Sequence, residues 1–243
     1  TARGIWAIIT GIPDVTEFKT ASRNPNLVDQ HTILNDLKDY EKFYFLGGSA
    51  SWANIRGVLK DNIKGLHLYE QQDYSSPKID GWGISDKNLF LESNKVLSKQ
   101  QKPFFAIIQT ADNHRPYTIP KEDRLYIKMR SFPKDTLDKY GFWTNEELNA
   151  YAYMDYTYKV FMEAAAKEKY FNNTIFIFVG DHGIRGIAGD MMPKVWTDQS
   201  LTLQHVPMLF YAPGKIQPQV IERKVSQVDI MPTIAGLINK PVT

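Results

Sequence analysis

An aspartate and a histidine stand next to each other directly after an apolar run in the last third of the chain. The run covers residues 174–179, and Gly180, Asp181, His182 and Gly183 follow it. A tight turn flanked by glycines lets the two polar side chains converge, and a carboxylate oxygen with an imidazole nitrogen suits manganese, zinc or magnesium. The pair therefore predicts a divalent metal site. The alternative is that Asp181 only caps the turn and His182 packs beneath a loop.

A second polar cluster follows another apolar run, residues 104–108. It contains Asn113, His114 and Arg115, which concentrate hydrogen-bond donors where an anion would lie. The imidazole of His114 could donate to a phosphoryl oxygen or protonate a leaving alkoxide, and the guanidinium of Arg115 suits a phosphate or a neighbouring carboxylate. The alternative is a polar turn stiffened by Pro116.

Thr1 and a glycine loop are two further candidates. Thr1 precedes a predicted helix, whose N-terminus would stabilise both an alkoxide and an incoming phosphate. A base or a metal ion beside Thr1 would make its hydroxyl a nucleophile, although the residue could also be a plain helix N-cap. The loop at residues 47–54 presents the Ser49 hydroxyl and the Trp52 ring at a strand end. Its alternative is a strand-to-helix turn with Trp52 in the core.

The spacing of apolar residues predicts alternating helices and strands. Helices are expected at residues 2–10, 27–40, 52–63, 86–100, 145–169 and 229–238, and strands at 43–46, 66–69, 104–108, 174–179 and 206–211. Continuous apolar runs separated by helices are typical of parallel strands joined by right-handed crossovers. We therefore expect a doubly wound α/β fold with a mostly parallel central sheet and helices on both faces, and ligands at the carboxyl ends of its strands. Residues 115–143 lack periodicity and are interpreted as a surface excursion beside that edge.

The composition excludes several classes of protein. The chain has 243 residues, and 29 Lys and Arg side chains nearly balance 27 Asp and Glu side chains, so we expect no nucleic-acid partner. It contains no cysteine, which excludes disulfides, thiolate metal sites and cysteine nucleophiles. No apolar run reaches the roughly 18 residues that a membrane span requires. A single domain over residues 1–243 fits this length.

Seven collinear segments resemble the sulfatase-like branch of the alkaline phosphatase superfamily, and most closely its lipoteichoic acid synthase and phosphoglycerol transferase group. They are Thr-Ala-Arg-Gly at 1–4, Gly-Gly at 47–48 with Trp52 and Asn54, Trp-Gly-Ile-Ser-Asp at 82–86, Asn-His-Arg-Pro-Tyr at 113–117, Gly-Asp-His-Gly at 180–183, His-Val-Pro at 205–207 and Val-Asp-Ile-Met-Pro-Thr at 228–233. Each motif alone is weak, but their order covers nearly the whole chain. This agreement makes the resemblance specific.

The resemblance implies a metal-bound threonine nucleophile, which takes a phosphoryl-type group from a lipid head group and passes it to an acceptor hydroxyl. Thr1 matches the nucleophile, and Asp181 and His182 match the paired ligands that would hold one divalent ion (manganese, magnesium or zinc) together with Thr1. His114 matches a substrate-binding histidine, and we expect it to be catalytic. The other expected substrate-binding residues are Asn113, Arg115, Trp52, Ser49 and His205. For His205, the alternative is a buried structural role.

The resemblance also implies partners and a location. The partners would be a lipid head-group donor and a glycan or glycerol-type acceptor, at the periplasmic or extracellular face of the cytoplasmic membrane in a bacterial cell envelope. In this family a further acidic metal ligand lies N-terminal to the nucleophile, on the first strand of the sheet. Because this sequence starts at Thr1, we expect it to lack that strand, that ligand and any membrane anchor upstream.

Three other functions compete with this interpretation. A sulfate ester hydrolase shares the architecture, but its formylglycine comes from a Cys/Ser-x-Pro-x-Arg motif that this sequence does not contain. An N-terminal nucleophile hydrolase would use the α-amine of Thr1 as its base, but that chemistry usually rests on stacked antiparallel sheets. A degenerate domain that binds head groups without turnover is the third.

Overall fold

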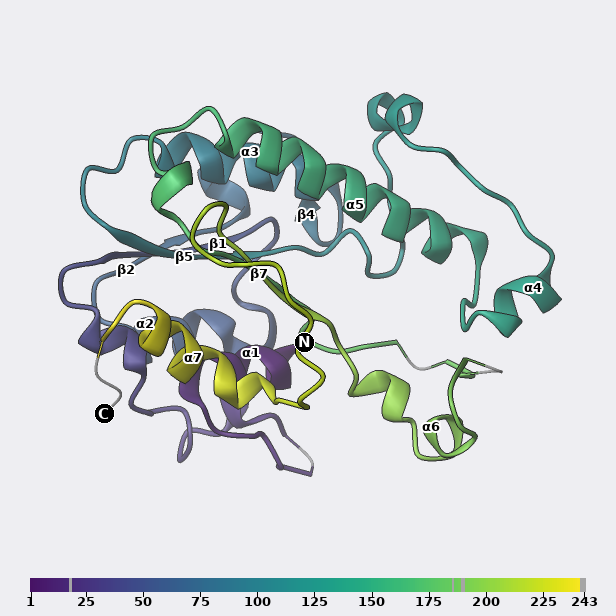
Figure 1. Cartoon of the computed structure of the whole chain (residues 1–243), viewed down its shortest axis with the longest axis horizontal. Helices are drawn as coiled ribbons and strands as arrows, with labels where there is room; N and C mark the ends of the chain where they lie inside the picture. Colours follow the sequence, from purple (N-terminus) through teal and green to yellow (C-terminus); the bar gives the residue numbers. More distant parts are fainter. Residues whose placement is uncertain (18, 185, 189–190, 241–243) are drawn as a thin grey trace.

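Helices cover both faces of a central sheet (Figure 1). The computed structural model describes residues 1–17, 19–184, 186–188 and 191–240. One face carries α3 (Asp86–Leu97) and α5 (Asn145–Ala165), and the other carries α1 (Ala2–Thr10), α2 (Ile55–Asn62) and α7 (Ile230–Leu237). The predicted α/β architecture is confirmed.

The middle strand of the sheet is β1 (Glu41–Leu46), which pairs in parallel with β2 (Leu66–Tyr69) on one side and β5 (Phe104–Gln109) on the other. Two further strands, β6 (Phe176–Val179) and β7 (Met208–Tyr211), pair antiparallel with each other. A short antiparallel pair, β3 (Lys78–Asp80) and β4 (Gly83–Ile84), precedes α3. The parallel central sheet is therefore as expected, and the antiparallel direction of the last pair is a detail that the apolar pattern did not show.

A hydrophobic core lies on each face of the central sheet, and alternate side chains of β1 enter one core or the other. Tyr44 and Leu46 pack with α1 and α2, whereas Phe43 and Phe45 pack beneath α3. Successive residues of a strand point to opposite faces of the sheet, so a strand covered on both sides is apolar throughout. This burial explains why the run that ends at Leu46 predicted a central strand.

The helix expected at residues 27–40 does not form, and that prediction was wrong. The segment contains only a short 3₁₀ turn, Ile33–Asp36. Its polar groups bond to other parts of the chain: the Thr32 hydroxyl donates to the Ile9 carbonyl at 2.7 Å, and the Asn62 side chain bonds the main chain of Val28 and Gln30 at 2.7 Å each. These long-range bonds replace the local bonds of a helix. The other predicted elements are present, with ends that differ by up to four residues.

The predicted surface excursion at residues 115–143 is confirmed. It contains the 3₁₀ helix η5 (Lys121–Tyr126) and α4 (Lys134–Lys139), which lie away from the sheet in Figure 1. Side chains of α5 hold its backbone: Asn149 Oδ1 accepts from the Arg130 main chain, and Asn145 Oδ1 from that of Phe132, at 2.8 Å each. Across the described residues, no helix is both long enough and apolar enough to cross a bilayer.

Candidate active site

Thr1, Asp181 and His182 meet where β6 ends. The Thr1 Oγ1 atom lies 3.3 Å from Nε2 of His182, and the Thr1 main-chain nitrogen lies 3.5 Å from Oδ2 of Asp181. That carboxylate oxygen is 3.7 Å from the same imidazole nitrogen. Although Thr1 occupies the N-cap position of α1, its side chain makes no capping hydrogen bond. The hydroxyl therefore faces the aspartate and histidine pair instead of serving its own helix.

A glycine and a glutamine hold the Asp181 turn from two sides. A Cβ atom at Gly4 would lie only 2.3 Å from the carbonyl oxygen of Asp181, so α1 can approach the turn this closely only with glycine at that position. On the other side, Gln227 Nε2 donates to the carbonyl oxygens of Gly180 and Asp181, at 2.8 Å each. The turn is thus clamped between the first helix and a residue near the C-terminus.

The ring of His182 is oriented by its neighbour. Its Nδ1 donates to the carbonyl oxygen of Gly183 at 2.7 Å, which leaves the lone pair of Nε2 free on the side of Thr1. Asp181 Oδ1 accepts from the His182 main-chain N–H at 2.9 Å, so Oδ2 is the oxygen that lies towards the Thr1 nitrogen and the imidazole. One carboxylate oxygen and one imidazole nitrogen therefore lie beside Thr1.

The opposite wall of the site is aromatic. His114 Nδ1 donates to the carbonyl oxygen of Arg115 at 3.0 Å, and the indole Nε1 of Trp82 donates to the same oxygen at 2.6 Å. The His114 and Trp82 rings are 4.3 Å apart between centroids, and Trp52 meets Trp82 edge-on at 6.1 Å. Trp82 therefore links the histidine to the glycine loop and fixes where its imidazole lies.

A pocket separates the two walls. The residues that line it are Thr1, Trp52, Trp82, Gln109, Thr110, Ala111, Asn113, His114, Tyr151, Asp181, His182 and Ile184. Behind it, the Tyr44 hydroxyl donates to Gln109 Oε1 at 2.6 Å. Burial and the nearby Asp181 charge raise the pKa of Tyr44, so this hydroxyl stays protonated and continues to donate.

The glycine loop after β1 touches the Trp82 segment through its backbone. A Cβ at Gly48 would lie 2.5 Å from the Trp82 carbonyl oxygen, and one at Gly83 would lie 1.7 Å from the Gly47 carbonyl oxygen. Gly83 also has a φ of 109°, a conformation that side chains disfavour. Glycines on both loops are therefore what bring Trp82 against the pocket.

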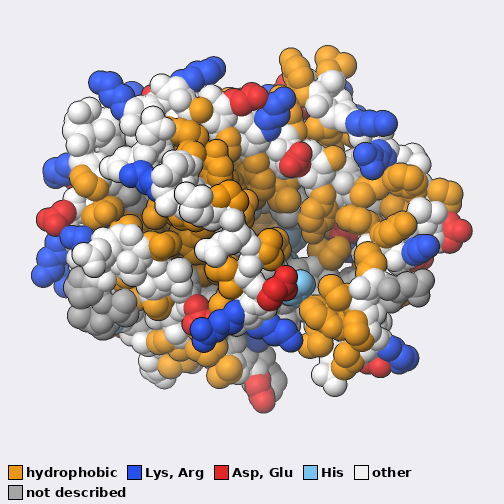
Figure 2. All heavy atoms as spheres, in the orientation of Figure 1, with side chains coloured by type: hydrophobic (Ala, Val, Ile, Leu, Met, Phe, Trp, Pro, Cys, Tyr) orange, Lys and Arg blue, Asp and Glu red, His pale blue; other side chains and the backbone are white. Residues whose placement is uncertain are grey.

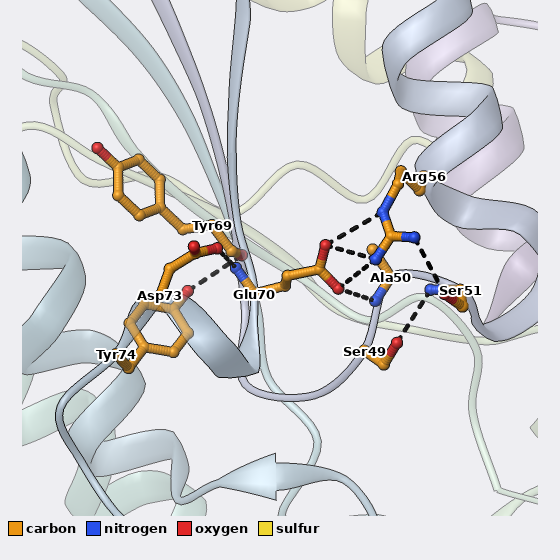
Figure 3. Close-up of polar contacts among 8 residues, drawn as sticks. All are labelled: Ser49, Ala50, Ser51, Arg56, Tyr69, Glu70, Asp73 and Tyr74. Atoms are coloured by element: carbon orange, nitrogen blue, oxygen red, sulfur yellow. Dashed lines mark hydrogen bonds and ion pairs between the residues drawn. The ribbon is translucent and has the colours of Figure 1, made fainter.

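An ion pair between an exposed arginine and a buried glutamate fixes the other end of the glycine loop. Figure 3 shows Arg56 of α2 pointing at Glu70, whose carboxylate accepts from Nη2 at 2.6 and 2.7 Å and from Nε at 3.1 Å. The same carboxylate accepts from the Ala50 main-chain N–H at 3.0 Å. The Arg56 charge and these hydrogen bonds hold the pKa of Glu70 below its usual range despite burial, so the clamp stays ionised.

Beneath His114, two buried aspartates join its loop to the start of α3. Asp86 accepts from the main-chain N–H groups of Ala111 and Asp112 at 2.8 and 3.0 Å, and Asp112 Oδ2 accepts from the Asp86 N–H at 2.6 Å. Burial raises the pKa of Asp86 to about 6. Burial and the Asp86 charge raise that of Asp112 to about 9. The higher pKa favours Asp112 as the group of this pair that holds a proton at neutral pH.

Comparison with known proteins identifies the family. The family model described as Sulfatase matches residues 1–240. The chain belongs to the sulfatase family. A relative, the lipoteichoic acid synthase-like protein YvgJ of Bacillus subtilis (strain 168), is 28% identical over 221 residues, which cover 86% of this chain and 34% of that protein. The chain thus spans about a third of the length of the curated relatives it matches.

Two solved structures have the same fold as this sulfatase-family chain. A protein of the alkaline phosphatase superfamily from Vibrio parahaemolyticus superposes with a TM-score of 0.77 at 28% identity, over 98% of this chain and 54% of the other. The lipoteichoic acid synthase LtaP of Listeria monocytogenes gives 0.80 at 20% identity, over 99% and 60%. The expected superfamily membership is confirmed, and the relatives are enzymes.

The predicted site residues of this sulfatase-family chain fall into two groups. Thr1, Asn113, His114, Asp181, His182 and Trp52 all line the pocket. Trp52 is 42% exposed, so its alternative role as a core residue is excluded.

Three other predicted residues do not line the pocket. Ser49 accepts from the Ser51 main chain at 3.3 Å, the guanidinium of Arg115 stacks on Trp143 with its Cζ 5.3 Å from the ring centroid, and the exposed His205 meets Trp196 edge-on at 5.1 Å. The buried structural alternative for His205 does not hold either, because its side chain is exposed.

Several residues at the site were not among the predicted ones, and Trp82, Tyr151 and Gln227 are the most informative of them. The Trp82 motif was part of the family resemblance, so its signal was present. Tyr151 lies on α5 among many aromatic residues, and nothing in its spacing distinguishes it. Gln227 acts through carbonyl oxygens about 47 residues away in the chain, a relation that a single sequence does not show.

The donor set fits a divalent ion. Within the described residues no group of three His, Cys, Asp or Glu side chains could hold a metal. Asp181 and His182 nevertheless present a carboxylate oxygen and an imidazole nitrogen beside the Thr1 hydroxyl. A hard oxygen with a borderline nitrogen is the chemistry that manganese, magnesium or zinc accepts. These three residues are where such an ion would be held.

Proposed function

We propose that the protein is a metal-dependent transferase that moves a phosphoglycerol or related head group from a lipid donor, through Thr1, to an acceptor hydroxyl. The observation that carries this proposal is the uncapped Thr1 hydroxyl, 3.3 Å from His182 Nε2 at a helix N-terminus. Membership of the sulfatase family and the lipoteichoic acid synthase relatives support it.

In this proposal the Thr1 hydroxyl releases its proton to solvent, its oxygen attacks phosphorus, and the bond between phosphorus and the lipid alkoxide breaks. A divalent ion held by Thr1, Asp181 and His182 would favour ionisation of the hydroxyl and neutralise phosphoryl charge. His114, on the opposite wall, protonates the departing alkoxide. The head group is then attached to Thr1, and the N-terminus of α1 stabilises its negative charge.

The second half reverses the first. An acceptor hydroxyl loses its proton to His114 and attacks the same phosphorus, and the bond to Thr1 breaks. The hydrogen bond from His114 Nδ1 to the Arg115 carbonyl leaves Nε2 as the atom that carries this proton in both halves. Asn113, beside His114 in the pocket lining, would donate to the phosphoryl oxygens. Trp52 and Trp82 would contact the apolar carbons of donor or acceptor.

The relatives also support a place of action. Relatives of this chain are named lipoteichoic acid synthases, and from this we infer a lipid head-group donor, a glycan or glycerol-type acceptor, and the outer face of the cytoplasmic membrane in a bacterial cell envelope. Hydrolysis of a sulfate ester is less well supported, because the sequence contains no formylglycine motif.

The decisive experiment is to trap the head group on Thr1. Incubation with phosphatidylglycerol and manganese, followed by mass spectrometry of the N-terminal peptide, should find the phosphoglycerol group on Thr1 in wild type. It should find none in Thr1→Ala or in wild type with chelator. Head-group release without any adduct would contradict the threonine nucleophile. Sulfate release from an aryl sulfate, with no action on the phosphodiester, would favour the sulfatase reaction instead.

A further inference from the structure

Large apolar side chains are exposed along one short part of the chain, the excursion between β5 and α5. They are Leu125, Tyr126, Met129, Phe132, Tyr140 and Trp143, which together we name the apolar rim. The most exposed are Leu125 at 88% and Tyr126 at 67%. Figure 2 shows hydrophobic side chains gathered over the α4 and α6 side of the molecule. Several large exposed apolar side chains on one excursion are typical of an interaction surface.

Basic side chains alternate with the apolar rim. Six Lys and Arg residues are exposed between positions 121 and 139: Lys121, Arg124, Lys128, Arg130, Lys134 and Lys139. The same stretch has four carboxylates, one of which, on Asp123, is buried against Lys87. The whole chain is almost neutral, so this local excess of positive charge is a property of the excursion. Apolar side chains among cations match a surface with an apolar interior and anionic head groups.

Contacts with α3 and α5 hold the segment that carries the start of the apolar rim. Tyr126 stacks on Tyr156 of α5 with ring centroids 5.5 Å apart. The buried Asp123 accepts from the Tyr153 hydroxyl at 2.8 Å and pairs with Lys87 of α3. The exposed faces of the rim are thus presented outward by a framework anchored on the two long helices.

The rim is also joined to the pocket. Its last member, Trp143, stacks under the Arg115 guanidinium, and the Arg115 carbonyl oxygen fixes both His114 and Trp82. Glu147 bonds the Trp143 main chain at 2.7 Å and the Tyr117 hydroxyl at 3.1 Å. A flat partner that contacted the rim would therefore lie beside the pocket mouth.

We propose that the apolar rim and its basic residues form a docking surface for an anionic lipid bilayer, which brings lipid head groups to the pocket. The choice of a bilayer rests on the proposed lipid donor and on the charge match, since a second copy of this nearly neutral chain offers no matching excess of anions. Leu125 and Met129 enter the apolar layer, and Lys121 and Lys128 lie against the head groups.

The test is co-sedimentation of the 243-residue chain with vesicles, without substrate turnover. The vesicles contain phosphatidylserine in phosphatidylcholine, so that their anionic lipid is not the proposed phosphoglycerol donor. The paired change Leu125→Ser with Met129→Ser should lower the partition coefficient at least about tenfold. Lys121→Glu with Lys128→Glu should also lower the partition coefficient at least about tenfold, because each lysine near an anionic surface raises that coefficient about fivefold. Added salt should weaken wild-type binding.

Matched controls remove equal apolar area and equal charge elsewhere. Val220→Ser with Ile221→Ser changes two side chains that are 85% and 69% exposed, and Lys64→Glu with Lys99→Glu changes two exposed lysines. Both should leave partitioning within about twofold of wild type. His114→Ala should also leave it unchanged, because docking does not use the pocket.

Several results would overturn the docking surface. An equal loss of vesicle binding in the control pairs would mean that binding is non-specific. Equal binding to vesicles of pure phosphatidylcholine would show that charge plays no role. Wild-type dimers that dissociate in the Leu125 and Met129 variant, without any vesicle binding, would assign the rim to a second copy. Docking that disappears only in the rim variants, in a protein that forms no Thr1 adduct, would uphold this inference while the proposed function failed.

Discussion

The two walls of the pocket are held in place by different physical means. Main-chain packing and one side-chain amide hold the wall of Thr1, Asp181 and His182: α1 touches the Asp181 carbonyl at Gly4, and Gln227 bonds the same turn. On the opposite wall, glycine contacts bring up Trp82, but the His114 loop rests on ionisable groups instead. It is tied to α3 through two buried carboxyl groups.

Because of this difference, the two walls should tolerate different kinds of substitution. Close contacts between backbone segments do not change with pH, but they leave no room for an added methyl group. Buried carboxyl groups tolerate a change of shape better than a change of protonation, because an uncompensated buried charge is costly. The Thr1 wall should therefore be sensitive to sterics and the His114 wall to charge.

The largest expected effect comes from removing one functional side chain from each wall. Asp181→Ala should abolish both metal binding and turnover, since it removes a proposed ligand. His114→Ala should lower turnover by about 10² to 10⁴ and leave the metal bound, because it removes only a proton donor. Metal analysis of the purified variants, with turnover measured in parallel, checks the pair. Loss of metal from His114→Ala would move that residue to the ligand set.

The second prediction tests the steric wall with two glycines in helices. Gly4→Ala places a methyl group 2.3 Å from the Asp181 carbonyl oxygen, so α1 must move. The expected cost is about 1–3 kcal/mol of stability with a large loss of turnover. Gly236→Ala in α7 is the control, because no atom lies within 4 Å of its added Cβ. It should stabilise the protein by about 0.5–1 kcal/mol. Chemical unfolding and turnover assays of both variants test this prediction. A Gly4→Ala variant with wild-type stability and turnover would show that α1 can shift without cost.

Much of the fold follows from local pattern, and so does half of the site. The run before Gly180 is apolar because Phe176 and Phe178 pack against α5, so its end marked where Asp181 and His182 would lie. The segment at 27–40 misled because its amphipathic spacing is real, while Thr32 and Asn62 form hydrogen bonds across the fold. Side-chain bonds between distant segments leave no periodic trace in a sequence.

The arrangement of the second wall was less predictable for the same reason. His114 and Asn113 were expected at the site from residue type and strand end. Trp82 reaches the pocket because Gly48 and Gly83 allow two loops to touch, and Arg115 turns away because Trp143 offers its ring. Both outcomes depend on which loops meet in space.

The third prediction concerns the two aspartates beneath His114. Asp86 accepts two main-chain N–H groups, so Asp86→Asn leaves one of them facing an amide NH₂ group and should cost about 1–3 kcal/mol. It should also reduce turnover by displacing the His114 loop. Asp112→Asn is the matched change, since Asp112 is already neutral and its oxygen accepts one N–H group. Because asparagine is neutral at every pH, this change spares the folded protein the uptake of a proton at pH 7, so it should leave stability unchanged or raise it. Equal costs in urea unfolding would show that the proton is not on Asp112.

The last prediction concerns the pH dependence that this proton gives to stability. The folded pKa of Asp112 is about 9, first because of burial and then because of the Asp86 charge, whereas an unfolded aspartate has a pKa of about 3.9. Between these values the native protein holds a proton that the unfolded chain has released. Stability from this group is therefore full below about pH 4 and declines as pH rises towards 9, by at most about 1.4 kcal/mol per pH unit. Asp112→Asn removes the group, so its unfolding free energy should change less between pH 6 and pH 8 than that of wild type. Urea unfolding at several pH values measures both slopes, and parallel curves for the two proteins would mean that other groups set the pH dependence.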